Sequence, residues 1–349
     1  MIRLMKRWQT ALLVLVLLVT ACMSSEPAPS GGGPLPSGSP TAGEGRQDAP
    51  GGVGSAGNLK LRMGLLPILD VIPFHVAQQN GYFKDAGLEV ELKPVKSAQE
   101  RDALMQAGEI DGMLNDLIST ALFNQNGPRI KIVAVARRAY PNAAQYRILA
   151  SPKSGISSPE QLKGVEIGIS KNTVIQYVTD RLLGQVGLKP DEIKTVEYTV
   201  ITTRYEALMS DQIKAATIPD PLAMGAVAGG AKVVLDDTRY TQFSQSELSF
   251  SVQTLQSHPD AVRKFLVTWS RAVDELNKNP ETYQDVLIQQ KVVPESIQGT
   301  YQLPPFPKNE ITTEAEWNDA VQWMVEKGLI KAPVAYRDAV DGNYFEVNN

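Results

Sequence analysis

Two α/β lobes are predicted for the part of the chain that follows residue 58. Strand-like and helix-like patterns alternate over residues 59–138 and again over residues 157–236, which is the order that builds mostly parallel sheets covered by helices. A helix-rich segment follows from residue 257. The chain has 349 residues, of which 43% are hydrophobic and 21% are charged, so it is long and apolar enough to bury two cores.

The first series carries clear start signals for its helices. Pro73 stands at the first position of one helical pattern, and Ser97 forms a capping box with Glu100 at the start of the next. Glycines at the ends of these patterns favour termination. We expect strands at residues 59–66, 88–95, 110–114 and 129–138, and helices at residues 73–87, 97–108 and 115–127.

The second series repeats this order at similar length. An alternating strand at residues 247–255 then returns the chain, so two crossings are expected between the lobes, near residues 146–151 and 247–253. In the second lobe we expect helices at residues 157–164, 172–187, 203–212 and 220–230, and strands at residues 165–170, 193–200, 213–218 and 231–236.

The C-terminal helical patterns have an apolar face. Phe265 and Trp269 stand four residues apart, and Trp317 and Val321 repeat that spacing, which is typical of a helix packed on a core. We expect these tryptophans to pack in the protein rather than to stack on a ligand. We also expect the tail to fold back on the first lobe.

The first 22 residues have the anatomy of a secretion signal. Arg3, Lys6 and Arg7 precede the short apolar run of residues 11–19, and Cys22 ends the sequence VTAC, which resembles a bacterial lipobox. We expect cleavage before Cys22 and lipidation of the new N-terminal cysteine, which would anchor the chain at the extracytoplasmic face of a cell membrane. The alternative is a plain secretion signal with an incidental cysteine.

The next segment has a composition that does not fold. Residues 23–57 are dominated by Gly, Pro and Ser with almost no bulky apolar residue, which predicts a disordered tether. The predicted organisation is therefore a signal peptide at residues 1–21, a lipidated tether at 22–57, a first lobe at 58–148 plus 253–349, and a second lobe at 149–252. The net charge of −4 gives no support for a nucleic-acid partner.

Ligand contacts are expected at the carboxyl ends of the strands, because open α/β sheets bind ligands there, against helix N-termini. Each polar residue at these ends has an alternative role as the cap of the following helix, above all Asp116 and Thr173. The strand-end candidates are Asp70, Phe74, Asn115, Asp116, Ser170, Asn172, Thr173 and Asp220.

A second group of candidates follows the last strand of the first lobe. Arg138, Tyr140 and Tyr146 lie next to the expected crossing. A cation beside aromatic rings at a lobe boundary suits a flat or anionic ligand. The alternative for this segment is a solvated loop.

Three motifs carry a resemblance to a known family. They are GYFKDAGLEV at residues 81–90, GEIDG at residues 108–112 and LKGVEIG at residues 162–168. The chain resembles the solute-binding proteins of nitrate, sulfonate and taurine type and of thiamine-pyrimidine-precursor type, some relatives of which bind riboflavin. The resemblance implies a type II periplasmic-binding-protein fold and a monomer. It also implies capture of a small solute by hinge closure and delivery to the permease and ATPase of an ABC importer.

The candidate residues favour one class of solute over another. A sulfonate or nitrate site needs donors and positive charge, whereas the candidate segments offer Asp70, Asp116 and Asp220, with only Arg138 and Arg204 as cations. Carboxylates beside aromatic rings better suit a neutral or amino-bearing heterocycle, such as riboflavin or a thiamine pyrimidine precursor. Sulfonate, taurine and nitrate remain the alternative. We expect Asp70→Ala to weaken binding and to leave the melting temperature nearly unchanged.

The residues give little support to an enzyme, although the same fold also hosts enzymes. Cys22 is the only cysteine, His75 and His258 are the only histidines, and they stand far apart in the sequence. Neither a Gly-rich phosphate loop, a G-x-S-x-G motif nor a metal-ligand spacing is present. We expect no catalysis, no cofactor and no metal. A hydrolase that uses carboxylates alone remains the alternative.

Overall fold

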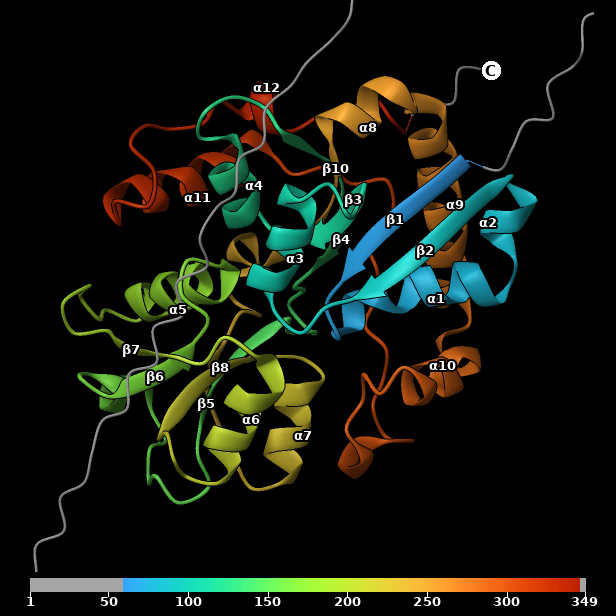
Figure 1. The fold of residues 1–349 in the computed structure, drawn as a ribbon. Coiled ribbons are helices and arrows are strands. Elements are labelled where there is room, and N and C mark those ends of the chain that lie inside the picture. The colour runs from blue at the N-terminus through green and yellow to red at the C-terminus, as the bar shows by residue number, and fades with distance from the viewer. Residues whose placement is uncertain (1–58, 346–349) are drawn as a thin grey trace, which may run out of the picture. The chain divides into compact units, whose positions relative to one another are not determined.

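The computed structural model describes residues 59–345, and Figure 1 shows their arrangement in two sheets, each with helices packed against it. The expectation of two α/β lobes is confirmed. The first sheet has the order β2-β1-β3-β10-β4 and the second β7-β6-β8-β5-β9. The strands of the first sheet are β1 (Leu59–Leu65), β2 (Leu88–Pro94), β3 (Gly112–Asn115), β4 (Ile130–Arg138) and β10 (Gln245–Ser251). Those of the second are β5 (Tyr146–Ala150), β6 (Glu166–Ile169), β7 (Lys194–Glu197), β8 (Ala215–Pro219) and β9 (Lys232–Asp236).

The helices follow the predicted order, with ends shifted by a few residues. In the first lobe they are η1 (Leu69–Val71), α1 (Ile72–Gln79), α2 (Tyr82–Asp85), α3 (Ala98–Gln106) and α4 (Leu117–Asn124). In the second lobe they are η2 (Pro159–Leu162), α5 (Val174–Gln185), α6 (Ile201–Met209), α7 (Leu222–Ala228) and η3 (Thr241–Phe243). The C-terminal part has α8 (Val252–Ser257), α9 (Pro259–Lys278), η4 (Pro280–Tyr283), α10 (Gln284–Gln289), η5 (Glu295–Ile297), α11 (Glu314–Glu326) and α12 (Tyr336–Ala339).

The expected lobe boundaries need correction, because each sheet contains one antiparallel strand. Strand β10 pairs antiparallel with both β3 and β4, so residues 245–252 belong with the first lobe rather than the second. Strand β5 pairs antiparallel with β8 and β9, so residues 146–148 belong to the second lobe. The crossings therefore lie at residues 139–145 and 237–244, earlier than predicted. An alternating pattern identifies a strand but not the sheet that it joins.

The core of the first lobe is aromatic. The long helix α9 packs on α1, where the ring of Trp269 meets that of Phe74 at 4.7 Å between centroids, and Phe265 stacks on Phe83 at 5.6 Å. Trp269 and Trp317 are both almost completely buried. The prediction that these tryptophans pack inside the protein is confirmed.

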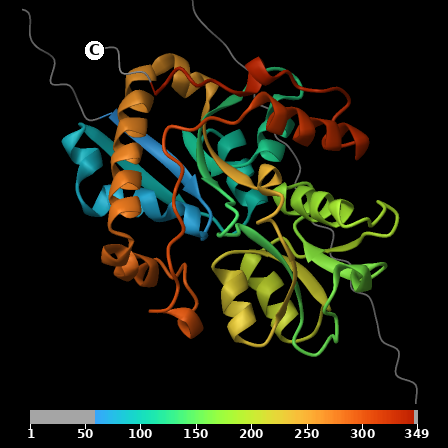
Figure 2. The ribbon, with the colours of Figure 1, turned by 180° about the vertical axis from the view of Figure 1, so that it is seen from behind.

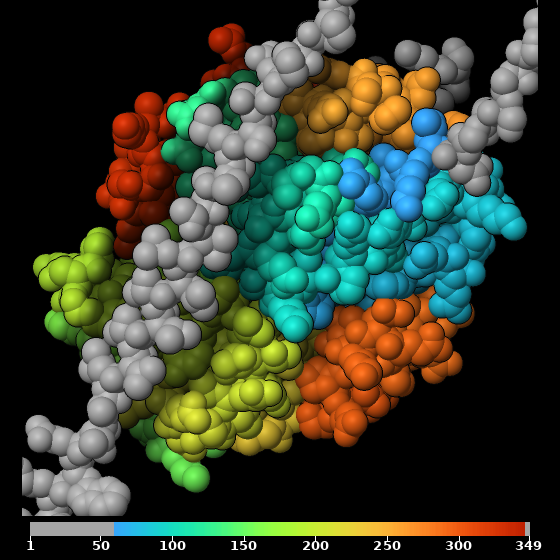
Figure 3. Space-filling view, in the orientation of Figure 1, coloured from blue at the N-terminus to red at the C-terminus, as the bar shows by residue number. Residues whose placement is uncertain are grey.

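The C-terminal segment contacts both lobes, whereas the sequence predicted contact with the first lobe only. Helix α11 packs on α4 of the first lobe, and its Asp319 accepts a 2.6 Å hydrogen bond from Tyr177 of α5 in the second lobe. Figure 2 shows the extended chain that leads from the α10 region to α11. At the other end of this chain η5 packs on α7, and the orange α10 region lies beside the yellow second lobe in Figure 3.

The predicted signal peptide, the lipidated Cys22 and the tether at residues 22–57 lie outside the described residues. Within residues 59–345, none of the helices combines the length and the hydropathy needed to cross a bilayer.

A buried carboxyl group on β10 predicts a pH-dependent stability. Glu247 is completely buried, and neither carboxyl oxygen has a hydrogen-bond partner among the described residues. Burial raises its pKa well above the usual range; Thr312 and Arg138 oppose this rise, and Glu316 and Asp116 add to it. The pKa of such a carboxyl group is higher in the folded state than in the unfolded state. The free energy of unfolding therefore falls as the pH rises above the unfolded pKa of about 4.3.

We therefore expect Glu247→Gln to stabilise the protein at neutral pH, because the neutral amide avoids the cost of burying a charge. In chemical denaturation, the midpoint of this variant should exceed that of the parent protein by a margin that grows from pH 4 to pH 7. The exposed Glu206→Gln on α6 is the matched control and should show no such trend. A margin that is constant with pH would contradict the prediction.

Candidate functional site

A cavity of about 50 Å³ lies between the two lobes, at the carboxyl ends of their strands. This is the position predicted for a ligand site from the general rule for α/β sheets. The first lobe contributes Leu66, Ile68, Ala98 and Asp116 to the wall. The second lobe contributes Tyr146, Ser170, Thr173, Val174, Ile175, Thr199, Ile201, Arg204 and Pro219. The surface of the wall is mostly apolar; the first lobe contributes one polar residue, Asp116, and the second lobe contributes the others.

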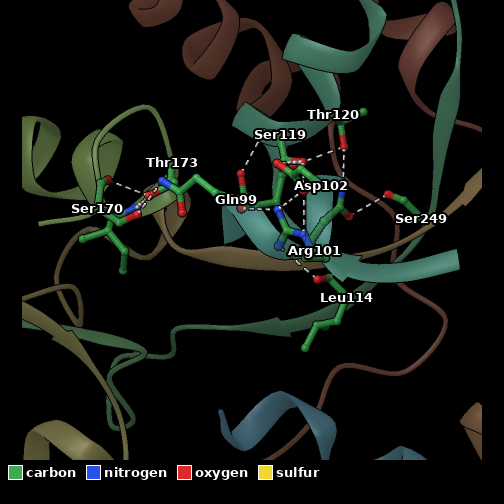
Figure 4. A network of polar contacts seen from close by, with 12 residues as sticks. Gln99, Arg101, Asp102, Leu114, Ser119, Thr120, Ser170, Thr173 and Ser249 are labelled. Carbon is green, nitrogen blue, oxygen red and sulfur yellow. Dashed lines mark hydrogen bonds and ion pairs between the residues drawn. The ribbon is translucent and has the colours of Figure 1, made fainter. Parts of the chain in front are cut away.

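Two hydroxyl groups of the second lobe are held by the turn that follows β6. Thr173 accepts a hydrogen bond from the backbone of Ile175 and donates one to the Ser170 carbonyl at 2.8 Å, so it caps α5. The Ser170 hydroxyl accepts a 3.2 Å hydrogen bond from the Gln99 amide of α3. Figure 4 shows that Gln99 reaches Ser170 from the other lobe. This contact joins the two walls of the cavity.

On the first lobe, Asp116 holds the start of α4. Its carboxylate accepts a 2.9 Å hydrogen bond from the backbone of Ser119 and lies 3.6 Å from the Arg101 guanidinium. Burial raises the pKa of Asp116, and the nearby charge of Arg101 opposes that rise. The capping role that the sequence left open for Asp116 and Thr173 is confirmed for both. Both also lie in the cavity wall.

Tyr146 and Arg204 are buried polar residues that the second lobe contributes to the wall. Burial raises the pKa of the Tyr146 phenol well above its usual range, so this group is neutral at physiological pH. Arg204 is completely buried, and its Nη1 donates to the Tyr198 carbonyl at 2.9 Å. Burial lowers the pKa of Arg204 to about 10, which still leaves the guanidinium charged near neutral pH.

Asp70 does not lie in this wall, contrary to its predicted role. Its carboxylate is 1% exposed and accepts hydrogen bonds from Ser246 at 2.5 Å, from Arg137 at 3.4 Å and from Gln145 at 3.5 Å. These partners lie on β10, on β4 and in the first crossing between the lobes. The carboxylate is thus part of the junction between the sheets. These partners could not be inferred from the local pattern, since the nearest is 67 residues away along the chain.

Asp220 also has an arginine partner. Arg147 donates to it from Nε and from Nη2, each at 2.9 Å, in a bidentate pair. This pair lines a second groove, of about 380 Å³, together with Met224, Tyr301 and Leu303. The structure therefore separates Asp220 from the cavity that holds Ser170 and Thr173.

The remaining candidates lie away from the interlobe cavity. Phe74 is in the aromatic core, which does not fit the ligand contact predicted for it. Asn115 is buried between Thr120 and Ser249, with hydrogen bonds of 2.8 and 2.7 Å. Arg138 forms ion pairs with two carboxylates of the C-terminal segment, Glu310 at 3.0 Å and Glu316 at 3.4 Å.

Two candidates lie on loops. Tyr140 is half-buried in a turn closed by reciprocal backbone hydrogen bonds with Ala143. Asn172 has a left-handed backbone (φ 58°) and lines a neighbouring groove with Lys171 and Glu197. Of the eleven ligand contacts predicted from the sequence, four lie in the wall of the interlobe cavity: Asp116, Tyr146, Ser170 and Thr173.

Neither histidine lies in the wall of the interlobe cavity. His75 lies on α1 outside the wall of the interlobe cavity, and burial lowers its pKa, so the imidazole is neutral. Among residues 59–345, no three His, Cys, Asp or Glu side chains gather closely enough to hold a metal ion.

Arg204 and Thr199 are polar wall residues that the predicted ligand contacts do not include. The sequence analysis names Arg204 as a cation of the candidate segments but not as a ligand contact. The sequence does contain a feature that points to Arg204, because its spacing to a later isoleucine is repeated in the two lobes. Arg101 and Ile110 in the first lobe have the same nine-residue spacing as Arg204 and Ile213 in the second.

Comparison with known proteins fits this geometry. The model of the family described as "NMT1/THI5 like" matches residues 69–283, which is more than half of the chain. The chain belongs to this family. A relative that spans nearly the whole length is the riboflavin-binding protein RibY of Chloroflexus aurantiacus, which is 23% identical over 95% of each chain. The 4-amino-5-hydroxymethyl-2-methylpyrimidine phosphate synthase THI11 of Saccharomyces cerevisiae is 24% identical over 60% of this chain and 64% of its own.

Solved structures share the fold of this family member at low sequence identity. The aliphatic sulphonate binding protein SsuA of Escherichia coli aligns with a TM-score of 0.68 and 20% identity, over 82% of this chain and 99% of its own. The nitrate-binding protein NrtA of Synechocystis PCC 6803 aligns with a TM-score of 0.67 and 12% identity, over 82% and 87%. The predicted periplasmic-binding-protein fold is therefore confirmed.

The buried position of Asp70 reverses the outcome expected for its substitution. Asp70→Ala would leave the guanidinium of Arg137 buried without its carboxylate, which costs about 3–5 kcal/mol in comparable sites. We expect a large fall in the free energy of unfolding, measured by chemical denaturation. Asp85→Ala is the control, since its ion pair with Arg271 is solvent-exposed and 3.7 Å long, and should cost at most about 1 kcal/mol. Equal losses would contradict the structural role.

Proposed function

We propose that the chain is the solute-binding component of an ABC importer and captures a flat, riboflavin-like heterocycle between its two lobes. The observation that carries this proposal is the interlobe cavity, whose wall is made by both lobes at the carboxyl ends of their strands. A solute bound there would contact both lobes at once. It would therefore favour the closed arrangement over the open one, which is how ligand binding is coupled to hinge closure.

Binding at this position requires the lobes to separate. The cavity of about 50 Å³ is far smaller than the several hundred cubic ångströms of a typical ligand site. The Gln99–Ser170 hydrogen bond connects α3 of the first lobe to the turn after β6 of the second. It is a single contact between neutral groups and costs little to exchange for water. The solute would enter as the two walls part.

The composition of the wall supports a heterocycle with carbonyl acceptors. Leu66, Ile68, Val174, Ile175 and Ile201 give the wall apolar surface on both lobes, which suits a flat ring. The carboxylates expected to receive ring amino groups are engaged by protein partners: Asp70 by Arg137, Asp220 by Arg147, and Asp116, which lies in the wall, by Arg101 and the backbone of Ser119. This removes the basis for an amino-bearing pyrimidine precursor. Riboflavin is the favoured solute, as in the name of the full-length relative RibY.

A small anion is the second candidate, and Arg204 is the observation that favours it. A buried guanidinium in the wall is the type of donor that a sulfonate or nitrate requires. The structural likeness to the sulphonate-binding protein SsuA and to the nitrate-binding protein NrtA does not separate the two candidates, because each is at most 20% identical to this chain.

The rest of the proposal follows the sequence. Lipidation of Cys22 would anchor the chain to the extracytoplasmic face of the membrane, and the Gly/Pro/Ser tether at residues 22–57 would give the lobes reach. The partners would be the permease and the ATPase of the importer, and the chain would act as a monomer without a cofactor. The lobes would correspond to residues 58–138 plus 245–349 and to residues 146–236.

Calorimetric titration tests this proposal. The purified protein should bind riboflavin with a micromolar or lower Kd, and more tightly than 4-amino-5-hydroxymethyl-2-methylpyrimidine, taurine or nitrate. Tight binding of taurine or nitrate with no binding of riboflavin would contradict the choice of solute.

Two variants of helix α3 locate the site. Ala98→Phe places a ring in the interlobe cavity and should weaken binding at least ~10-fold, because a filled cavity excludes the solute. Ala107→Phe adds the same ring at the exposed end of the same helix and should leave the affinity unchanged. Equal affinities of both variants and of the parent protein would place the site elsewhere.

A further inference from the structure

The two lobes contain the same buried arginine in the same setting. Arg101 of α3 and Arg204 of α6 each pack under a glycine of the neighbouring strand. A Cβ atom on Gly64 of β1 would lie 3.5 Å from Arg101 Cγ, and one on Gly168 of β6 would lie 3.5 Å from Arg204 Cγ. The isoleucine nine residues later, at 110 or 213, also meets that glycine in each lobe. The two arginines are therefore equivalent positions of a structural repeat.

In the first lobe the charge of the arginine is offset by two carboxylates. Asp102 lies 2.8 Å from the Arg101 guanidinium, Asp116 lies 3.6 Å from it, and the Leu114 carbonyl accepts from Nη1 at 3.1 Å. Figure 4 shows this network around Arg101. Two carboxylates and a carbonyl thus offset the cost of burying the charge, as a buried cation requires.

In the second lobe both compensating carboxylates are missing. The positions equivalent to Asp102 and Asp116, counted from the arginine, are Tyr205 and Pro219. Only the Tyr198 carbonyl remains as a partner of Arg204, and Nε and Nη2 have no hydrogen-bond partner among the described residues. Burial lowers the pKa of Arg204, and among the described residues only Tyr146 opposes this effect. The buried arginine therefore has carboxylate partners in the first lobe and none among the described residues in the second.

We propose that Arg204 is the group that recognises the solute, and that the solute presents a negatively charged or carbonyl oxygen to its free Nε and Nη2 atoms. This inference rests on the proposed function, since it assigns the recognition group of that same cavity. Arg204 belongs to the cavity wall, whereas Arg101 does not. A solute oxygen would take the place that Asp102 and Asp116 occupy in the first lobe. A solute that offers only amino groups would leave the guanidinium unpaired.

This assignment defines the chemical class of the solute. A planar guanidinium with two adjacent free donors suits a bidentate acceptor, such as a carboxylate, a sulfonate or an adjacent carbonyl oxygen and ring nitrogen of a flavin. The apolar wall accommodates the remainder of the molecule. Among the candidates above, riboflavin, the sulfonates and nitrate carry such acceptors, and the aminopyrimidine does not.

The experiment compares Arg204→Met with its repeat-related control Arg101→Met. Titrations use riboflavin and butanesulfonate as probes. Loss of a hydrogen bond to a charged group weakens binding roughly 10- to 100-fold, so Arg204→Met should lose that much affinity for the probe that the parent protein binds. If that probe is butanesulfonate rather than riboflavin, the proposed heterocycle is wrong but the role of Arg204 stands. Unchanged affinity in Arg204→Met overturns the inference for either probe.

Stability of the solute-free protein gives a second readout that needs no ligand. Removing an uncompensated buried charge should preserve or raise the melting temperature of Arg204→Met. Arg101→Met should instead lower it by several degrees, because Asp102 and Asp116 lose their partner. If Arg204→Met melts as far below the parent protein as Arg101→Met does, then Arg204 is a structural residue and the inference fails, even where neither probe binds.

Discussion

The arrangement of the lobes depends on the buried carboxylate of Asp70, which lies beside both crossings between them. It accepts hydrogen bonds from Arg137 at the end of β4, from Gln145 in the first crossing and from Ser246 at the start of β10. Asp237 of the second crossing accepts from the backbone of Gln145 at 3.0 Å, so the crossings also bond to each other. Buried charges need such complete partnership, because an isolated charge is costly in the interior.

This junction determines where a solute can be recognised. Because Asp70 and Asp220 are neutralised by Arg137 and Arg147, the acidic residues of the strand ends serve the scaffold rather than the solute. The cavity lies on the other side of Tyr146, between α3 and α4 of one lobe and α5 and α6 of the other. There the wall includes Asp116, which is paired with Arg101, and the guanidinium of Arg204, which has no carboxylate partner among the described residues. The acidic residues of the sequence favoured a neutral or amino-bearing solute, whereas Arg204 favours a solute with oxygen acceptors.

Local sequence signals predicted the order of helices and strands, but they did not predict which residues far apart in the chain contact each other. Periodicity and capping residues gave the order of the elements, and Ser97 caps α3 as its pattern indicates. The cavity also lies where the strand-end rule placed it. The partners of Asp70 could not be predicted, because Ser246 is 176 residues away along the chain. The same holds for β10, whose alternating pattern does not identify the sheet that it enters, and for Arg204, whose missing partners are visible only beside Arg101.

The most direct measurement is a crystal structure of the protein with its bound solute. We expect a solute between the lobes, with an oxygen about 2.7–3.2 Å from Nε or Nη2 of Arg204, and with the Asp70–Arg137 and Asp220–Arg147 pairs intact. A solute whose amino group binds Asp70 or Asp220 in place of the arginine would contradict it. So would a solute seated in the groove beside Tyr301, with Arg204 still unpaired.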